Sequence, residues 1–404
     1  MPRTPKIVWQ LQRHFRRNAF GWRNGPPRTR LKEAVSELKR AAKRDPVLAA
    51  EGAVRLIERL PPALEQTDDS SGALGNAIRN LLAFAVDLIN AAGADARTRE
   101  DWLERLWVAY ENDERPWIEG LGELWGALCG DTMTAARWSE RLTPRPRRPR
   151  GEREPYEPYD RCTVPWLSAA LQAGRYDAIV AALKHDDFWL HVRWAVAALR
   201  AKGETEAALR RAETAAESGL FVGDPAQVCE ELLRELGRHQ EAFERYALAA
   251  HESSSRVKWL KSLLAAYPER DPGAMLAALV ATTPGQEGRW FAAARQAGLL
   301  DAAVALAERS ATEPATLITA VKQHAESEPP FTLRCGLLAL RGLLRGDAFD
   351  PEKIDLDLLV RHLTQAADAL GVRDDLPGQI DALLQAHARP GDGWWAPRIR
   401  RALT

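Results

Sequence analysis

The densest group of side chains that could do chemistry is a short segment with two histidines and two aspartates. His185, Asp186 and Asp187 are consecutive, and His191 follows four residues after Asp187. Imidazoles and carboxylates bind zinc and act as general acids and bases. The segment falls between two expected helices, however, where short polar side chains commonly bond to the free backbone groups of helix ends. We therefore favour a capping role over a metal-binding role for these residues.

A second segment begins like a zinc-protease motif. His251-Glu252 matches the start of the pattern HExxH, in which two histidines bind one metal ion from the same face of a helix. Ser255 occupies the position of the second histidine, so the pattern lacks a ligand. The sequence also contains no Walker phosphate loop and no GxGxxG dinucleotide fingerprint. We predict that the chain is not an enzyme and that it uses no metal and no cofactor.

The four cysteines give no sign of a metal site or of disulfides. Cys129, Cys162, Cys229 and Cys335 are far apart, and none belongs to a CxxC pair. Such a distribution is typical of a reducing compartment. No apolar run of about 18 residues could span a membrane, and no apolar segment of a secretory signal follows the basic N-terminus. We expect a cytoplasmic protein, and the preference for arginine over lysine together with abundant alanine indicates a bacterial one.

Basic residues are concentrated at the N-terminus. Residues 1–44 contain 13 lysines and arginines and two glutamates, whereas the whole chain has 56 basic and 56 acidic residues. A segment of this charge can bind an external polyanion, or it can dock on the acidic remainder of the chain. Nucleic acid is thus one candidate partner of residues 1–44. The arginines that could contact an anionic partner are Arg13, Arg16, Arg17, Arg23, Arg28 and Arg30.

We expect one amphipathic helix in the basic arm, residues 1–30. Ile7, Leu11 and Phe15 recur at every fourth position, while the arginines lie on other sides of the helix. The helix could bind nucleic acid or an anionic membrane surface, or its apolar stripe could pack on the rest of the protein. Of these alternatives we favour packing. The segment 18–30, which contains a Gly-Pro-Pro sequence, should form a loop.

Residues 31–142 have the apolar periodicity of a helical module. Asp45-Pro46 should begin a helix, because an aspartate can cap the first turn and a proline is tolerated there. Pro61-Pro62 should end that helix. A further helix should begin at Pro116 and continue to Leu128.

Five tryptophans of this module lie at helical spacing. They could form an aromatic recognition surface, but their positions on the expected helices favour burial in the core. These residues are Trp102, Trp107, Trp117, Trp125 and Trp138.

Residues 143–162 contain five prolines among arginines and glutamates. Proline removes a backbone donor and fixes the backbone, so this composition does not support a helix. We expect a semi-rigid linker between two modules, although proline-rich basic segments can also be docking motifs or bind nucleic acid. The linker would separate residues 31–142 from a larger module, residues 163–404.

One turn pattern recurs in the larger module. Gly174, Gly203, Gly237 and Gly298, which are 29, 34 and 61 residues apart, each follow the apolar end of an expected helix. Glycine readily takes the left-handed conformation that ends a helix, and small and apolar residues then resume at helical spacing. The pattern predicts helical hairpins. Their near-regular spacing, with 61 close to two periods, indicates hairpins stacked as a solenoid.

Two of these turns resemble the turn between the helices of a tetratricopeptide repeat. They are Gly174-Arg175-Tyr176-Asp177-Ala178-Ile179 and Gly237 through Ala242, and Ala249-Ala250 is compatible with the same pattern. The stretch from Thr283 to Ala303 is similar to an uncharacterised family of bacterial helical-repeat proteins. The resemblance covers about residues 165–310. It implies protein binding through a concave helical surface and transfers no catalytic residue.

These features together predict an all-α chain, an α-solenoid of antiparallel tetratricopeptide-like hairpins preceded by an N-terminal helical module. A solenoid presents an extended surface and needs no deep pocket. We therefore expect a non-enzymatic scaffold that binds a protein or peptide partner. The alternative is a nucleic-acid-associated protein that uses the arginine-rich arm and the linker.

Overall fold

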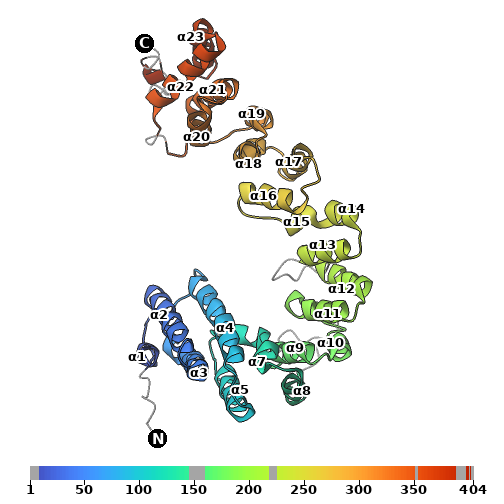
Figure 1. Cartoon of the computed structure of the whole chain (residues 1–404). Helices are drawn as coiled ribbons and strands as arrows, with labels where there is room; N and C mark the ends of the chain where they lie inside the picture. Colours follow the sequence, from blue (N-terminus) through green and yellow to red (C-terminus); the bar gives the residue numbers. More distant parts are fainter. Residues whose placement is uncertain are drawn as a thin grey trace, which may run out of the picture. The chain divides into compact units, whose positions relative to one another are not determined.

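The protein is all-α, as the periodicity predicts (Figure 1). The residues described by the structure form helices and turns and no strand. The chain divides into two compact units, Met1–Arg238 and His239–Thr404. The structure is a computed structural model, and it describes residues 9–144, 160–217, 225–350, 354–387, 397–399 and 401.

The first unit begins with five helices, two of which have an aspartate as N-cap. Asp45 accepts a hydrogen bond from the Leu48 N–H at 3.0 Å, and Asp95 accepts one from the Thr98 N–H at 2.9 Å. Each bond satisfies a donor that the first turn leaves free. The Thr98 backbone and hydroxyl also hold the pKa of Asp95 below its usual value. The helices are α1 (Gln10–His14), α2 (Gly25–Ala42), α3 (Pro46–Leu64), α4 (Ala73–Ala91) and α5 (Ala96–Glu111).

Two predictions about prolines are wrong. Helix α2 begins at Gly25 and not after the segment 18–30, because prolines in a first turn lack only donors that have no partner there. Helix α3 continues through Pro61-Pro62 to Leu64. Leu60 and Leu64 are fully buried, so the packing of the last turn offsets the hydrogen bonds that the prolines remove.

The helix predicted from Pro116 to Leu128 is two short helices, α6 (Gly120–Glu123) and α7 (Trp125–Cys129). Ser168 lies against the junction. Its hydroxyl accepts from the Gly126 N–H at 2.9 Å and donates to the carbonyl of the last residue of α6 at 2.8 Å. A Cβ atom on Gly126 would lie 2.2 Å from the Ser168 carbonyl oxygen, so the close approach requires glycine. The side chain of Ser168 thus replaces a helical bond at the break.

The tryptophans form the core that their spacing predicts. Trp102, Trp107, Trp125 and Trp138 are buried, and Trp117 is half-buried. The ring centroids of Trp107 and Trp125 are 5.3 Å apart, and those of Trp125 and Trp138 are 5.0 Å apart. Both pairs have the edge-to-face geometry that aromatic rings prefer. We call Trp107, Trp125 and Trp138 the tryptophan cluster.

The hydrophobic core of the first unit contains side chains from both sides of the predicted linker, including Trp138 and Trp166. Residues 145–159 of the linker lie outside the described residues, and the predicted module boundaries stay a prediction. Consecutive helices pack on each other here, as α11 does on α12 and α12 on α13. The remaining helices of the unit are α8 (Thr132–Arg141), α9 (Thr163–Gln172), α10 (Tyr176–Ala182), α11 (Trp189–Ala201), α12 (Thr205–Glu217) and α13 (Pro225–Glu235).

The second unit has its own hydrophobic core, and again helices that are neighbours in the sequence pack together. Its start differs from a plain α-helix because a π-helix, Phe243–Ala247, lies between two short α-helices. Two 3₁₀ turns, Glu287–Trp290 and Arg373–Asp375, precede α18 and α23. The helices are α14 (His239–Ala242), α15 (Leu248–Ala250), α16 (Arg256–Ala266), α17 (Pro272–Ala281), α18 (Phe291–Gln296), α19 (Leu300–Arg309), α20 (Pro314–His324), α21 (Pro329–Arg345), α22 (Leu356–Leu370) and α23 (Leu376–His387).

The four glycines of the repeated pattern end their helices in the same way. Their φ angles lie between 71° and 79°, in the left-handed region. After each glycine, the N–H of the next residue bonds to the carbonyl five residues before it, at 2.8 to 3.0 Å. This is the Schellman arrangement, which satisfies carbonyls that a helix end leaves free. The four bonds are Arg175 to Ala170, Glu204 to Leu199, Arg238 to Leu233 and Leu299 to Ala294.

Candidate functional site

The basic arm packs on the first unit through its apolar side chains. Trp9, Leu11 and Phe15 are buried, and the predicted stripe residue Ile7 lies outside the described residues. The carboxylate of Glu37 accepts hydrogen bonds from the first two backbone N–H groups of α1, at 2.8 and 3.0 Å. The arm is therefore attached by packing and by hydrogen bonds, which is the alternative that we favour from the sequence.

The six arginines predicted to contact an anion lie on the surface of this region. Arg17 is 3.7 Å from the Glu65 carboxylate, and the half-buried Arg30 is 2.6 Å from Glu33. Such solvent-exposed pairs stabilise by only about 0 to 1 kcal/mol. A contact of these arginines with an anion stays a prediction. Those that are exposed and have no carboxylate partner among the described residues are Arg13, Arg16, Arg23 and Arg28.

The histidine and aspartate segment lies at a helix end, as predicted, although the N-cap residue of α11 is Phe188 and makes no side-chain cap bond. Asp186 is buried, and its carboxylate accepts from the Phe188 N–H at 2.9 Å and contacts the His191 Nδ1 atom at 2.8 Å. Arg211 donates to the Leu183 carbonyl at 3.0 Å and to the carbonyl of Asp186. Burial lowers the pKa of Arg211, although the charge of Asp186 opposes this shift. The bonds hold the end of α10 and the turn before α11.

The side chains of the protease-like segment bond to the helix that follows it. The His251 Nδ1 atom is 2.8 Å from the Ser262 hydroxyl. Ser255, at the position where a zinc protease would have its second histidine, is the N-cap of α16 and accepts from the Lys258 N–H at 3.4 Å. Thus His251 contacts α16, and Ser255 caps the same helix.

Three of the four cysteines lie in the interior of the protein. Cys129, Cys229 and Cys335 are buried and Cys162 is half-buried, all as free thiols. Removal from water raises the pKa of Cys129 and Cys335 to about 12, so both thiols stay protonated and weakly nucleophilic at neutral pH. In the part of the chain that the structure describes, no three His, Cys, Asp or Glu side chains come together to hold a metal ion. Nor does any helix there combine the length and the apolar character needed to cross a membrane.

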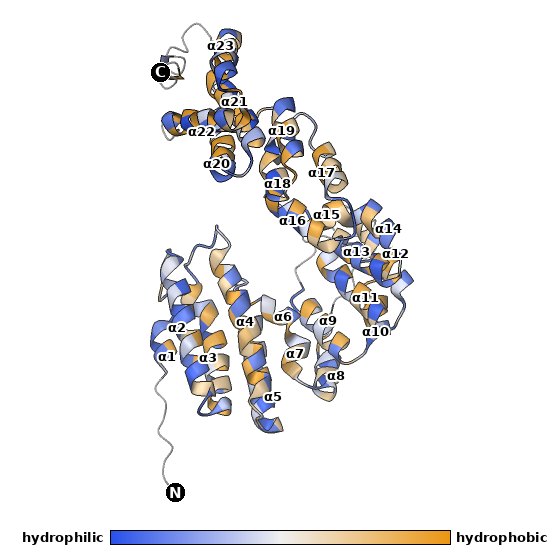
Figure 2. Cartoon of the chain, turned by 45° about the horizontal axis from the view of Figure 1, so that its top comes forward, coloured by the Kyte–Doolittle hydropathy of each residue, from blue (hydrophilic) through white to orange (hydrophobic). Residues whose placement is uncertain are grey.

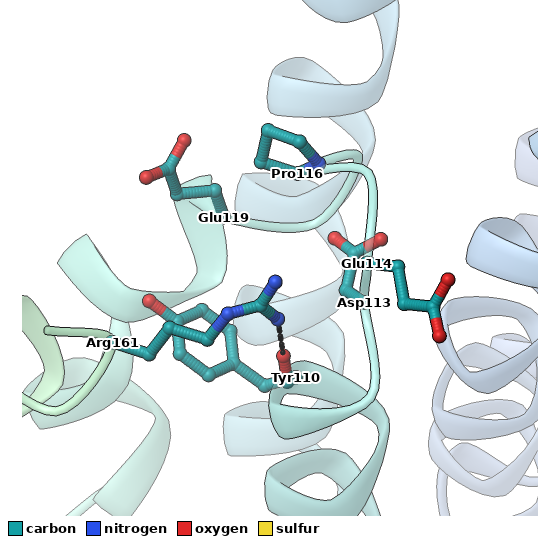
Figure 3. A pocket seen from close by; sticks show the side chains of 6 residues that line it. All are labelled: Tyr110, Asp113, Glu114, Pro116, Glu119 and Arg161. Atoms are coloured by element: carbon teal, nitrogen blue, oxygen red, sulfur yellow. Dashed lines mark hydrogen bonds between the residues drawn. The ribbon is translucent and has the colours of Figure 1, made fainter. Parts of the chain in front are cut away.

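A cavity of about 330 Å³ lies beside the loop between α5 and α6 (Figure 3). Its buried acid is Asp113, which is 2% exposed. One carboxylate oxygen accepts from the Ile118 N–H at 2.7 Å, and the other has no hydrogen-bond partner among the described residues. Arg161 crosses the cavity and donates to two carbonyls at the end of α5, at 3.1 Å each. The lining residues are Tyr110, Asp113, Glu114, Pro116, Glu119 and Arg161.

Asp113 has the most informative electrostatics of this cavity. Burial raises the pKa of its carboxyl group to about 6, and the nearby charge of Glu119 adds to this shift. The Ile118 N–H and the charge of Arg161 act against it. The group can therefore donate or accept a hydrogen bond within a pH unit or so of neutrality. With the guanidinium of Arg161 beside it, the buried carboxyl group suits the binding of a polar group.

A second hollow, of about 310 Å³, lies between α17 and α19 in the second unit, and we call it the alanine groove. Leu276, Val280 and Leu306 are buried at its base. Ala277, Ala281 and Ala305 stand exposed along it, and Ala302 is half-buried. Helix α17 has no polar side chain in its ten residues, and Figure 2 shows it in the hydrophobic colours. Apart from Arg309 the groove is lined by apolar side chains.

Sequence reasoning missed both hollows. A signal for the groove was present, because a helix that is apolar all round is normally covered by something. Asp113 had only a weak signal, an acid in the turn before Pro116, and the cavity that it lines also contains Arg161, 48 residues further along the chain. Such a contact is not visible in local spacing.

A comparison with protein-family models found no match for this chain, and a comparison with curated proteins found no significant similarity. By its fold the chain is an all-α protein in which helices adjacent in sequence pack on each other. The tetratricopeptide-like character of the hairpins stays a prediction.

Proposed function

We propose that the chain is a non-enzymatic scaffold whose tetratricopeptide-like hairpins form an α-solenoid and bind a protein or peptide partner. The observation that carries the proposal is that the same glycine-ended turn occurs four times. Each time, a side chain just after the glycine pairs with a basic side chain of a following helical segment. Repeated supersecondary units that contact only their neighbours build extended surfaces, and such surfaces bind peptides and protein domains.

The pairing joins the third residue after each glycine to a basic side chain of the following hairpin. It uses aspartate, glutamate or glutamine at the first position and lysine or arginine at the second. The first position is the same in all four pairs, whereas the basic partner follows the first helix of the next hairpin in three pairs and lies inside α21 in the fourth. The repeated use of the first position supports a stacked repeat. The donor and acceptor pairs are Lys202 and Asp177 at 2.6 Å, Arg238 and Glu206 at 3.2 Å, Arg270 and Gln240 at 2.6 Å, and Arg334 and Asp301 at 3.5 Å.

The surface that we assign to the partner is the alanine groove. Exposed methyl groups on adjacent helices leave a shallow apolar hollow without side chains that would have to move. An amphipathic helix can bury its apolar residues in such a hollow, at positions three and four residues apart. The groove is therefore suited to a helical peptide with a narrow apolar face.

Selection of peptides from a random phage-displayed library on the immobilised full-length chain tests this proposal. We expect selected peptides to share apolar residues at helical spacing and to bind with a Kd near the micromolar range. Ala281→Arg and Ala305→Arg should each weaken binding at least tenfold, because a long charged side chain would fill the groove. The readout is fluorescence anisotropy of the labelled peptide.

The matched control is Ala382→Arg, which changes an exposed alanine of α23 that does not line the groove. It should leave peptide affinity unchanged. Equal losses in all three variants, or a library from which no groove-dependent peptide emerges, would contradict the proposal.

A further inference from the structure

A row of basic side chains on α2 has no acidic partner among the described residues. Arg28, Lys32, Lys39 and Lys43 are exposed, and their spacings of four, seven and four residues place them on one side of the helix. Lys39 contacts only the face of the Phe84 ring, at 5.5 Å. Figure 2 shows α2 largely in the hydrophilic colours. With Trp22 and Arg23, just before the helix, these four residues make up what we call the basic face.

The two acids of α2 do not neutralise this row. Glu33 pairs with Arg30 at 2.6 Å, and the carboxylate of Glu37 is used by two backbone N–H groups of α1. In the neighbouring loop between α3 and α4, the Asp69 carboxylate accepts from the N–H groups of the second and third residues of α4, and Asp68 accepts from Ser70. The carboxylates nearest in the chain are thus engaged, while the cations of the basic face are available to a ligand.

Trp22 is an exposed ring on an anchored backbone. Its side chain is 71% exposed, whereas the tryptophan cluster is buried. Its carbonyl accepts from the Asp68 N–H at 3.1 Å. On either side, the Asn18 N–H bonds to the Pro62 carbonyl at 2.9 Å and the Asn24 side chain donates to Ser71 at 3.4 Å. The backbone at Trp22 is therefore fixed, and its ring is exposed just before the helix that carries the basic row, where a flat apolar ligand group can stack on it.

The chemistry of this face favours nucleic acid over a membrane surface. A helix that binds a membrane inserts a continuous apolar face between lipids. The described apolar side chains of the arm, Trp9, Leu11 and Phe15, are buried in the protein and cannot do so. One exposed aromatic ring next to a row of cations matches the arrangement that holds single strands, in which cations contact phosphates and bases stack on aromatic side chains.

We propose that the basic face binds single-stranded nucleic acid, with the phosphates on the row from Arg28 to Lys43 and a base stacked on Trp22. A single strand is required because its bases are free to leave the stack, while a duplex offers only phosphates. This role is independent of the scaffold function, because all residues of the basic face belong to the first unit and the alanine groove belongs to the second.

Fluorescence anisotropy with the full-length chain tests the proposal. The probes are fluorescein-labelled 20-nucleotide oligomers of deoxythymidine and of uridine and a labelled 20-base-pair DNA duplex, at about 50 and about 200 mM salt. Vesicles of phosphatidylcholine with and without phosphatidylserine are tested in a sedimentation assay. We expect the single strands to bind more tightly than the duplex and the vesicles, with a Kd that rises steeply with salt.

Two sets of substitutions separate charge from stacking. The quadruple variant Arg28→Gln, Lys32→Gln, Lys39→Gln, Lys43→Gln should reduce the slope of log Kd against log salt by about 3, since each lost phosphate contact on a single strand contributes about 0.7. Trp22→Ala should weaken binding of single strands about 5- to 100-fold with little change in that slope, and Trp22→Phe should restore most of the loss.

The control variant removes four exposed basic side chains of the second unit, Lys258→Gln, Lys261→Gln, Lys322→Gln and Arg361→Gln. It has the same net charge as the quadruple variant and should retain wild-type affinity. Circular dichroism checks that each variant is folded. Equal losses in the control and quadruple variants, no effect of Trp22→Ala, or preferential binding of duplex or of vesicles would each overturn the proposal.

Discussion

The tryptophan cluster and the alanine groove are built on the same principle of packed helices but with side chains of opposite size. In the first unit, the rings of Trp107, Trp125 and Trp138 fill the space between short helices, and Trp125 has no exposed surface. In the second unit, half of the residues of α17 and α19 that line the groove are alanines, and the space above them stays open to solvent.

The difference shows that helix packing alone does not decide where a protein can bind. Large rings at a helix contact make a dense core at which substitutions cost stability. Small side chains fill little of the space between two helices. They therefore leave a hollow at the surface in which a partner can bind. The same periodicity in the sequence thus produces a core in one unit and a surface in the other, according to the volume of the side chains.

The largest expected effect is in the tryptophan cluster. Trp125→Ala removes a fully buried ring and should lower the free energy of unfolding by about 3 to 5 kcal/mol. Ala305→Arg in the alanine groove should change it by less than about 0.5 kcal/mol, since its side chain points into solvent. Urea denaturation followed by circular dichroism measures both. Similar costs for the two substitutions would remove the contrast between core and surface.

An intermediate effect, tied to pH, is expected at Asp113, whose cavity borders the cluster through Tyr110. Its folded pKa of about 6 lies above the ordinary value of about 3.9. The folded state therefore binds more protons than the unfolded state between these values, and stability falls as the pH rises through this window.

Acidification from pH 7 to pH 4.5 should thus stabilise the wild type by about 2 kcal/mol more than Asp113→Asn, which has no proton to gain. Chemical denaturation at a series of pH values measures the difference. Parallel pH profiles of the two proteins would show that Asp113 does not titrate as its burial requires.

The smallest effect is expected at a repeated turn. Gly203 has a φ angle of 78° and open space around it, so Gly203→Ala meets no clash but should cost about 1 kcal/mol for the left-handed backbone. Gly378→Ala is the matched control, because this glycine lies inside α23 with open space and ordinary φ, and alanine there should stabilise by up to about 1 kcal/mol. Thermal unfolding distinguishes the two signs, and a stabilising Gly203→Ala would speak against the turn geometry.

The sequence was informative wherever one local interaction determines the structure. An aspartate before a helix, as at Asp45, and a glycine after one, as at Gly203, act within a single turn, so their effects can be predicted from neighbouring residues. The burial of tryptophans at helical spacing was predictable for the same reason. The turn phrase around the four glycines also has the predicted geometry in each case.

The failures have the opposite origin. Helix α3 passes through Pro61-Pro62 because distant side chains bury its last turn, and the helix expected after Pro116 is broken by Ser168 from another helix. The anion-binding role expected for Arg17 and Arg30 stays a prediction. Trp22 was not selected at all, since spacing cannot tell an exposed ring from a buried one.

The pairing of each turn with the next hairpin has a mechanical consequence. Asp177 pairs with Lys202 and Glu206 pairs with Arg238, so two successive turns of the first unit are each tied to the helices that follow. A pulling force along the chain would load these ties in series and not in parallel. Extension of the first unit in an optical trap should then proceed in small steps of about 30 residues, close to the spacings of Gly174, Gly203 and Gly237.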